Sequence, residues 1–300
     1  MGNAAVELSE AFAAAVEKQG AHVVRVEGGR RFTSSGIVYS ADGLILTASH
    51  GIGREEEVIV VGLPDGKEVK AKLLGRDFGT DLAVLRAEAT GLSPVAFGSV
   101  DGLKVGHLVL AIARPGRSAR TSLGIISALA NEEWHTPTGG KLEKYIQPDG
   151  GTLPGIGGSL LADAAGNALG LNTTGLVRGS CITLPGVTLK RVADSLVAHG
   201  RIRRGFLGVG TYPVQLTGPL AAQLKQDAAL AVVAIQPGGP SEKAGLLIGD
   251  VIATLDGKAV EHPGQLHRML NEDLVGKEIV AKVVRGGQVL DVKITVGTRP

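Results

Sequence analysis

Three separate stretches of the chain carry residue types that could together perform acyl-transfer chemistry. His50 follows an apolar run, Asp81 precedes a second one, and a glycine-rich turn occupies 146–161. A histidine can take a proton from a nucleophile and return it to a leaving group, while an aspartate can fix the tautomer of that histidine. A turn of glycines can aim several backbone N–H groups at one oxyanion. A nucleophile in the glycine-rich turn would complete such a site.

The spacing and the flanking residues of these stretches resemble the HtrA (Deg) family of trypsin-like serine proteases. The matching segments are Leu46-Thr47-Ala48-Ser49-His50, Thr80-Asp81-Leu82-Ala83-Val84-Leu85, Pro154-Gly155, Gly166, Gly170 and Asn172-Thr173. The resemblance covers about 5–298, which is nearly the whole chain. It implies that His50 is the general base and that Asp81 accepts a hydrogen bond from the other ring nitrogen of His50.

The nucleophile position of the family is occupied by Gly157. The family turn reads Pro-Gly-Asn-Ser-Gly-Gly-Pro-Leu, and a gap-free alignment places Gly157 at its serine, Gly158 after it, and Ser159 and Leu160 at the next Gly and Pro. Shifting the register by one residue breaks one flank. Loss of the nucleophile from a Ser-His-Asp site lowers kcat roughly 10⁶-fold. The N–H groups of Gly155 and Gly157 would still provide the oxyanion hole.

Ser159 is the alternative nucleophile. It lies two residues after Gly157, so in an extended chain its Cα would lie about 6–7 Å from the usual place. Attack needs the nucleophile within about 2.6–3.2 Å of the base, so the loop would have to refold. Otherwise Ser159 is a serine at the start of a strand, bonded to backbone. Three of four positions differ from Ser-Gly-Gly-Pro, which is more typical of natural drift than of a deliberate exchange, although one sequence does not separate the two.

By resemblance, Thr152 and Cys181 lie near the primary specificity pocket, where small side chains would leave room for an aliphatic residue. Cys181 is the only cysteine, so the chain forms no internal disulfide. Nothing near Cys181 in the sequence indicates a lowered thiol pKa. We therefore expect a small buried residue there and not a catalytic thiol.

Short apolar runs separated by turn signals recur from residue 21 to residue 185. Two sets of about six such runs predict a mostly β fold, and by resemblance a chymotrypsin-like double β-barrel with the site in its cleft. The expected domains are an N-terminal helical segment 1–20, a trypsin-like domain 21–200, a linker 201–204 and an α+β PDZ domain 205–300. A strand is expected at 94–96, and the polar stretch 131–144 is expected to be a mobile surface loop.

Two segments of the first 200 residues have helical periodicity. Residues 4–18 predict an amphipathic helix capped by Gly20. This helix would pack on the first barrel or, by resemblance, help to form a homotrimer. Residues 187–200 predict a second helix that ends at Gly200 and has one apolar face, made of Leu189, Val192, Leu196 and Val197.

The C-terminal third resembles a PDZ domain of the HtrA kind, with Ala244-Gly245-Leu246 and Gly249-Asp250-Val251-Ile252 as its specific signatures. The turn of Phe206, Leu207, Gly208 and Val209 would bind a peptide carboxylate while the peptide adds a strand to the sheet edge. A helix over 263–271 would form the other wall. We expect core packing for at least two of its apolar residues, Leu266, Met269 and Leu270.

Bulk properties exclude several functions. With 20% charged residues and a formal net charge of +2, the chain has no strong field to attract nucleic acid, and the basic run 201–204 is expected to be a solvated connector. No cofactor motif or metal-ligand spacing stands out, so neither is expected. There is no membrane-spanning run and no signal peptide at the start of this sequence. The protein is then either cytoplasmic or, by family, a periplasmic or other extracytoplasmic protein in mature form.

These observations lead to one preferred function and one alternative. The preferred function is a catalytically silent HtrA-like pseudoprotease that binds unfolded polypeptides or peptide C-termini through its PDZ domain. The alternative is an active serine endopeptidase of protein quality control that uses Ser159 or an altered nucleophile loop.

Overall fold

The structure is a computed structural model that describes residues 3–28, 33–53, 58–149 and 155–298. The chain divides into two compact units, Met1–Ile202 and Arg203–Pro300, and each is described by itself. The division falls inside the predicted linker 201–204, while the finer domain boundaries stay predictions. Thr152 lies outside the described residues.

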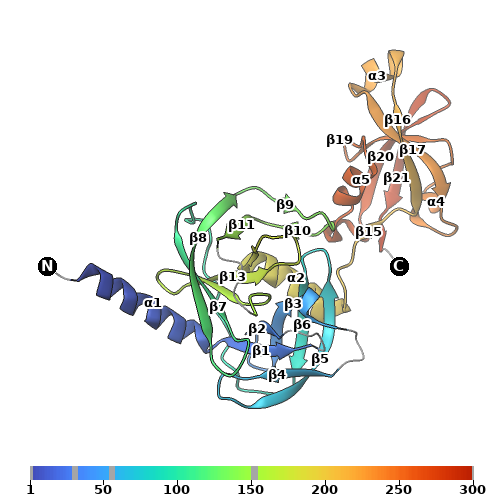
Figure 1. The fold of residues 1–300 in the computed structure, drawn as a ribbon. Coiled ribbons are helices and arrows are strands. Elements are labelled where there is room, and N and C mark those ends of the chain that lie inside the picture. Colours follow the sequence, from blue (N-terminus) through green and yellow to red (C-terminus); the bar gives the residue numbers. More distant parts are fainter. Residues whose placement is uncertain (1–2, 29–32, 54–57, 150–154, 299–300) are drawn as a thin grey trace. The chain divides into compact units, whose positions relative to one another are not determined.

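The first half of unit 1 is a closed barrel of six antiparallel strands in the order β1-β2-β3-β6-β5-β4 (Figure 1). β-branched and leucine side chains fill its interior, since Val24, Ile45 and Leu85 are fully buried. The strands are β1 Val23–Glu27, β2 Ser34–Val38, β3 Leu44–Ala48, β4 Ile59–Gly62, β5 Glu68–Asp77 and β6 Leu82–Ala87.

The second half of unit 1 is a six-stranded antiparallel sheet in the order β11-β8-β7-β12-β13-β14, and its end strands β11 and β14 contact each other. The two sets of six confirm the predicted mostly β, double-barrel fold. No strand forms at 94–96, where only a bridge joins Phe97 to Ala168. The strands are β7 Leu108–Ala113, β8 Arg120–Ala130, β11 Tyr145–Pro148, β12 Leu160–Asp163, β13 Ala168–Thr173 and β14 Ile182–Pro185.

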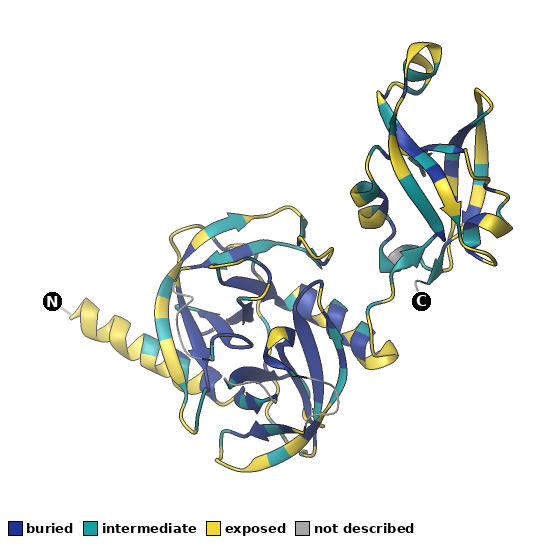
Figure 2. Cartoon of the chain, turned by 45° about the vertical axis from the view of Figure 1, so that its right-hand side comes forward, coloured by how far each residue is buried: buried dark blue, intermediate teal, exposed yellow. Residues whose placement is uncertain are grey.

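Helix α1 spans Ala4–Gly20 and packs on the second sheet, against β7 and β12, so its predicted place on the first barrel is wrong. Gln19 ties the end of the helix down, because its side-chain amide donates to the Gly166 carbonyl at 2.7 Å. Gly20 is the last helical residue, and Ala21 is the cap, in right-handed conformation. Most of α1 is exposed (Figure 2).

Helix α2 spans Gly186–His199 and ends, as predicted, on Gly200 in left-handed conformation, with φ 70°. Leu189, Val192 and Leu196 are fully buried on the side that contacts β5, β6 and β13. Val197 is 42% exposed, so its predicted place on the apolar face is wrong. The buried face of α2 joins both halves of unit 1 in one hydrophobic cluster.

Unit 2 is an antiparallel sheet in the order β16-β17-β18-β20-β21, with β19 paired to β18 and with a separate β15–β22 pair. β16 is thus an edge strand. The elements are β15 Gly205–Phe206, β16 Val209–Gln215, α3 Gly218–Leu224, β17 Ala228–Ile235, α4 Pro240–Lys243, β18 Val251–Leu255, β19 Lys258–Ala259, α5 Pro263–Met269, β20 Glu278–Arg285, β21 Gln288–Thr295 and β22 Gly297–Thr298, with a 3-10 turn at Glu272–Leu274.

Candidate active site

His50 and Asp81 meet at the ends of two neighbouring strands of the first barrel. His50 lies in the 3-10 turn Ser49–Gly51 that follows β3, and Asp81 immediately precedes β6, which pairs with β3. Nδ1 of His50 is 2.6 Å from Oδ2 of Asp81, and the backbone N–H of His50 donates to Oδ1 at 2.8 Å. Two contacts to one carboxylate fix both the backbone and the ring of the histidine. The side chain of His50 is 40% exposed and that of Asp81 is 8% exposed.

β13 supplies a third group to this pair. The Thr173 hydroxyl, fully buried, donates to Oδ2 of Asp81 and accepts from the Gly175 N–H at 3.0 Å. A Cβ on Gly175 would lie 2.7 Å from Cγ of Asp81 and 2.9 Å from Nδ1 of His50. Only glycine leaves room for the pair at that point. In the sequence, Thr173 is only one of the residues that match the family and Gly175 belongs to no motif, because the roles of both arise from tertiary contacts.

The turn before Asp81 is held by Asp77 at the end of β5. Its carboxylate accepts from the Thr80 N–H and the Thr80 hydroxyl, both at 2.8 Å, and from the Gly79 N–H at 3.1 Å. Asp81 itself has a φ of 58°, a left-handed conformation that aspartate tolerates better than most residues. The turn therefore presents the Asp81 carboxylate in one orientation.

The segment 131–144 packs on this turn, so the prediction of a mobile surface loop is wrong. It contains the paired strands β9 Trp134–His135 and β10 Lys141–Leu142, and Leu142 is fully buried. Trp134 packs edge-on against Tyr145, with ring centroids 4.9 Å apart. The Thr136 hydroxyl donates to the Gly79 carbonyl at 2.7 Å and accepts from the Gly140 N–H at 2.8 Å.

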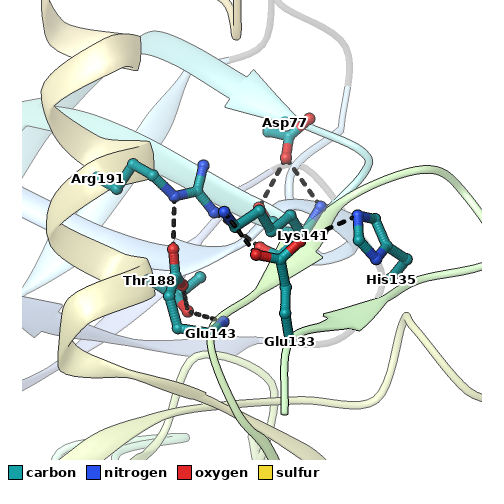
Figure 3. A network of polar contacts seen from close by, with 8 residues as sticks. Asp77, Glu133, His135, Lys141, Glu143, Thr188 and Arg191 are labelled. Carbon is teal, nitrogen blue, oxygen red and sulfur yellow. Dashed lines mark hydrogen bonds and ion pairs between the residues drawn. The ribbon is translucent and has the colours of Figure 1, made fainter. Parts of the chain in front are cut away.

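Ion pairs complete the attachment of this hairpin (Figure 3). Glu133 contacts both Lys141, at 2.7 Å, and His135, at 3.3 Å. Arg191 of α2 donates to Glu143 at 2.7 Å, and the Thr188 hydroxyl donates to the same carboxylate. Burial would raise the pKa of Glu143, but the hydrogen bonds from Thr188 and Arg191 outweigh it and lower that pKa. The hairpin therefore links α2 to the turn that carries Asp81.

Gly157 lies directly in front of the imidazole. A Cβ on Gly157 would be 3.0 Å from Nε2 and 3.1 Å from Cε1 of His50. The backbone there is held to β2, because the Ser35 N–H donates to the Gly157 carbonyl at 2.9 Å and the Ser35 hydroxyl donates to the Gly155 carbonyl at 2.7 Å. Gly155 has φ 75° and Gly158 has φ 81°, and a Cβ on Gly158 would lie 1.9 Å from the carbonyl oxygen of Ser35. Glycine is thus required on both sides of the position that faces His50.

Ser159 has a hydrogen-bond partner of its own. It is fully buried, and its hydroxyl accepts from Nδ2 of Asn172 at 3.0 Å. Oδ1 of Asn172 accepts in turn from the Thr183 hydroxyl at 2.7 Å. A different hydroxyl, that of Thr174, lies 3.5 Å from Nε2 of His50, beyond the usual range of an O–H···N hydrogen bond.

Cys181 is buried and lines a small cavity together with Ala111 and Ile156. Burial raises the pKa of its thiol to about 12. A thiol with that pKa remains protonated at neutral pH and is a poor nucleophile, in line with the expected small buried residue. Among the described residues, no group of three or more histidine, cysteine or acidic side chains could hold a metal ion.

The predicted peptide-binding residues of unit 2 form the turn that leads into the edge strand β16. Gly208 has φ 75°, and its carbonyl accepts from the Gln236 N–H at 2.8 Å. The Leu207 carbonyl accepts from the Ser241 N–H at 2.9 Å. Helix α5 contacts β16. Its apolar residues behave as expected, since Leu266 and Leu270 are buried in the core and Met269 is partly buried.

Fold and site together define a trypsin-like peptidase unit followed by a PDZ unit. The family model for a trypsin-like peptidase domain matches residues 34–171, and that for a PDZ domain matches 205–296. The chain belongs to the HtrA (Deg) family of serine endoproteases. It is 34% identical over 273 residues to a probable periplasmic DegP-like serine endoprotease of Chlamydia trachomatis, covering 89% of this chain and 54% of the relative.

Other proteins that are similar to this chain also belong to the HtrA family. A DegP-like protein of Halomonas elongata is 34% identical over 282 residues, covering 90% of this chain and 57% of that protein. The chain thus spans little more than half the length of these curated relatives. The solved HtrA-type protease AlgW with decapeptide is 30% identical, with a TM-score of 0.74 over 96% of this chain and 99% of AlgW. The serine endoprotease of Yersinia pestis is 27% identical, with a TM-score of 0.73 over 96% and 98%.

Proposed function

We propose that this protein is a pseudoprotease of the HtrA family: a protein without proteolytic activity that binds peptide C-termini through its PDZ domain. The observation that carries the proposal is the position of Gly157, whose missing side chain would face Nε2 of His50 at 3.0 Å. His50 and Asp81 would remain as general base and orienting carboxylate, and the N–H groups of Gly155 and Gly157 as an oxyanion hole. Without a hydroxyl between them, no acyl-enzyme can form.

The alternative, a working endopeptidase of protein quality control, needs a different nucleophile. Ser159 would have to leave its buried hydrogen bond with Asn172 and move toward His50. Breaking that bond costs about 1–3 kcal/mol for the unsatisfied partner alone, before any change in the backbone of the glycine-rich turn. The buried position of Ser159 therefore supports the silent site.

The PDZ unit supports the binding function. Its edge strand β16 begins at the glycine turn and lies beside α5, an arrangement that can add a peptide as an extra strand. The AlgW structures, with a decapeptide and with a tripeptide, are relatives that hold peptides. We propose that Phe206, Leu207, Gly208 and Val209 bind the terminal carboxylate and that unfolded polypeptides are the source of such ends. Thr152 and Cys181 would border the specificity pocket of the cleft.

Assembly and location are proposed by family. We propose a homotrimer, supported by Val6 and Leu8 on α1, which are 50% and 46% exposed, and by the exposed Leu123 on β8. Light scattering should give three times the mass of the chain. We propose an extracytoplasmic protein, because the relatives are named periplasmic. No helix among the described residues is long and apolar enough to span a membrane.

The function is tested by one pair of assays on the full chain. We expect no digestion of casein, and we expect fluorescence anisotropy to show binding of a peptide with a free hydrophobic C-terminus but not of its C-terminal amide. Casein digestion that disappears in Ser159→Ala would establish the alternative function. Equal binding of the acid and the amide would contradict the carboxylate-binding turn.

A further inference from the structure

The pairing of β16 with β17 fixes which backbone groups of β16 face the free edge of the PDZ sheet. The Gln236 N–H donates to the Gly208 carbonyl, so Gly208 faces β17. The N–H of Val232 donates to the backbone carbonyl of Asp250, the residue before β18, so Val232 faces away from β16. Because Val232 lies opposite Thr211, the N–H and C=O of Thr211 point to the free edge.

Alternation along the strand extends this pattern in both directions. A bulge between Gly210 and Thr211 shifts the register on β17 and leaves the alternation on β16 intact. Val209, Thr211 and Pro213 therefore face the free edge, while Gly210 and Tyr212 face β17. Proline has no N–H, and an outward position on an edge strand is where a sheet accommodates it. Pro213 is exposed, and the strand continues to Gln215.

A peptide strand added at this edge could form two backbone hydrogen bonds with Val209 and two with Thr211, since each offers an N–H and a C=O. Pro213 offers only its C=O as an acceptor. With its carboxylate at the glycine turn, an antiparallel peptide would place its last, third-last and fifth-last residues opposite Val209, Thr211 and Pro213. The C=O of the fifth-last residue would meet the ring of Pro213, where the ladder needs an N–H donor.

We propose that Pro213 ends the peptide-binding ladder, so that this PDZ domain recognises only about the last four residues of an extended C-terminus. This inference rests on the proposed binding function and adds a limit to the length of peptide that the domain binds. The ligand class is a short, carboxylate-terminated segment whose upstream residues leave the sheet edge. Disordered tails of unfolded chains fit this description, since they need not hold a long β-conformation.

The test combines peptide length with a proline exchange. Peptides of three, five and eight residues that share one hydrophobic C-terminus are titrated against the full chain, its Pro213→Val variant and its Pro219→Val variant. Pro219 lies at the start of α3 and is exposed, so its exchange changes a proline away from the edge strand. One recovered hydrogen bond corresponds to about three- to tenfold in affinity.

For the wild type and Pro219→Val we expect the five- and eight-residue peptides to bind alike. For Pro213→Val we expect the five- and eight-residue peptides to bind about three- to tenfold more tightly, with the tripeptide unchanged. Wild-type affinity that keeps rising from five to eight residues, or an equal gain for the tripeptide in Pro213→Val, would overturn the proposal. A failure of all three peptides to bind would instead contradict the proposed function.

Discussion

A Cβ on Gly157 would lie 3.0 Å from Nε2 of His50, so the glycine occupies the place from which a serine hydroxyl would be deprotonated. That separation is tighter than an ordinary contact by a few tenths of an ångström. The His50 side chain is 40% exposed, so the ring has room to yield. If the proposed loss of the nucleophile is right, one side chain and one small movement of the His50 ring separate this site from a complete triad.

The first prediction concerns restoring that side chain. Gly157→Ser should gain casein hydrolysis, because His50 and Asp81 already have the geometry of a base and its orienting carboxylate. We expect a gain of at least about 10²-fold over wild type, short of the roughly 10⁶-fold that a complete triad provides, because the ring must shift. Peptide release from labelled casein measures it. An inactive but folded Gly157→Ser would show that the neighbouring turn, including Ser159 and Leu160, has also diverged.

The second prediction concerns Gly175. In the Gly157→Ser background, Gly175→Ala should remove about 10²-fold or more of the regained activity, since its methyl group would collide with the Asp81 carboxylate and with Nδ1 of His50. Gly102→Ala is the matched control, because a methyl group at Gly102 meets nothing within 4 Å. Equal activities of the two variants would mean that the pair tolerates displacement.

The third prediction tests the hairpin. Thr136→Val keeps the side-chain shape but loses the hydrogen bonds with Gly79 and Gly140. Two lost bonds should speed amide hydrogen exchange in the turn 78–81 about tenfold or more. Thr121→Val, at an exposed position of β8, is the control and should leave that turn unchanged. Unchanged exchange in Thr136→Val would show that Asp77 alone holds the turn.

The fourth prediction concerns the thiol of Cys181, whose pKa burial raises to about 12. At pH 8 only about one part in 10⁴ would be thiolate, so iodoacetamide should modify the folded protein far more slowly than a free cysteine with a pKa of about 8.5. Unfolding in guanidinium should make the same thiol react fully, as read by intact mass. Rapid modification of the folded chain would contradict the burial of Cys181.

The fifth prediction concerns pH and the PDZ unit. Asp250 is 1% exposed, and hydrogen bonds from Arg285, then that from the Leu247 N–H, lower its pKa. A lowered folded pKa stabilises the fold above the unfolded value of about 3.9, and this contribution is lost as the pH falls through the folded pKa. Asp250→Asn should therefore lower the free energy of unfolding by about 2 kcal/mol at pH 7, and by progressively less as the pH falls from about 4 through the folded pKa of Asp250.

Hydrogen exchange of β17 and β18 reports this stability in the full chain. Asp291→Asn is the matched control, since Asp291 forms an exposed pair with Lys282 and should matter by less than about 0.5 kcal/mol. If Asp250→Asn lowers the free energy of unfolding by the same amount from pH 7 to pH 3, the charge of the carboxylate does not stabilise the fold.

The parts of the fold and site that local pattern determines could be predicted from the sequence. Short apolar runs separated by turn signals predicted two sets of strands, and Gly200 predicted the end of α2 because a left-handed cap favours a glycine. The alignment of Gly157 with the nucleophile of the family rests on matching residues on both of its flanks, and it stays a prediction. Each of these is a short-range signal.

The rest depends on contacts between distant segments. Thr173 and Asp81 are 92 residues apart in the sequence, and nothing in the residue types predicts the hydrogen bond between them. The stretch 131–144 is polar, so its attachment could not be predicted without knowing that Trp134 packs on Tyr145 and that Thr136 meets Gly79. The sheet on which α1 packs is likewise decided by tertiary burial of Phe12 and Val16, not by the periodicity of the helix.

The most direct measurement is the intact mass of the wild-type protein after incubation with a fluorophosphonate, beside Gly157→Ser treated in the same way. We expect no added mass on the wild type and one phosphonyl group on residue 157 of the variant, because only the variant has a hydroxyl at position 157, whose Cβ would lie 3.0 Å from Nε2 of His50. A phosphonyl adduct on any hydroxyl of the wild-type protein, formed at the rate of an ordinary serine protease, would contradict it.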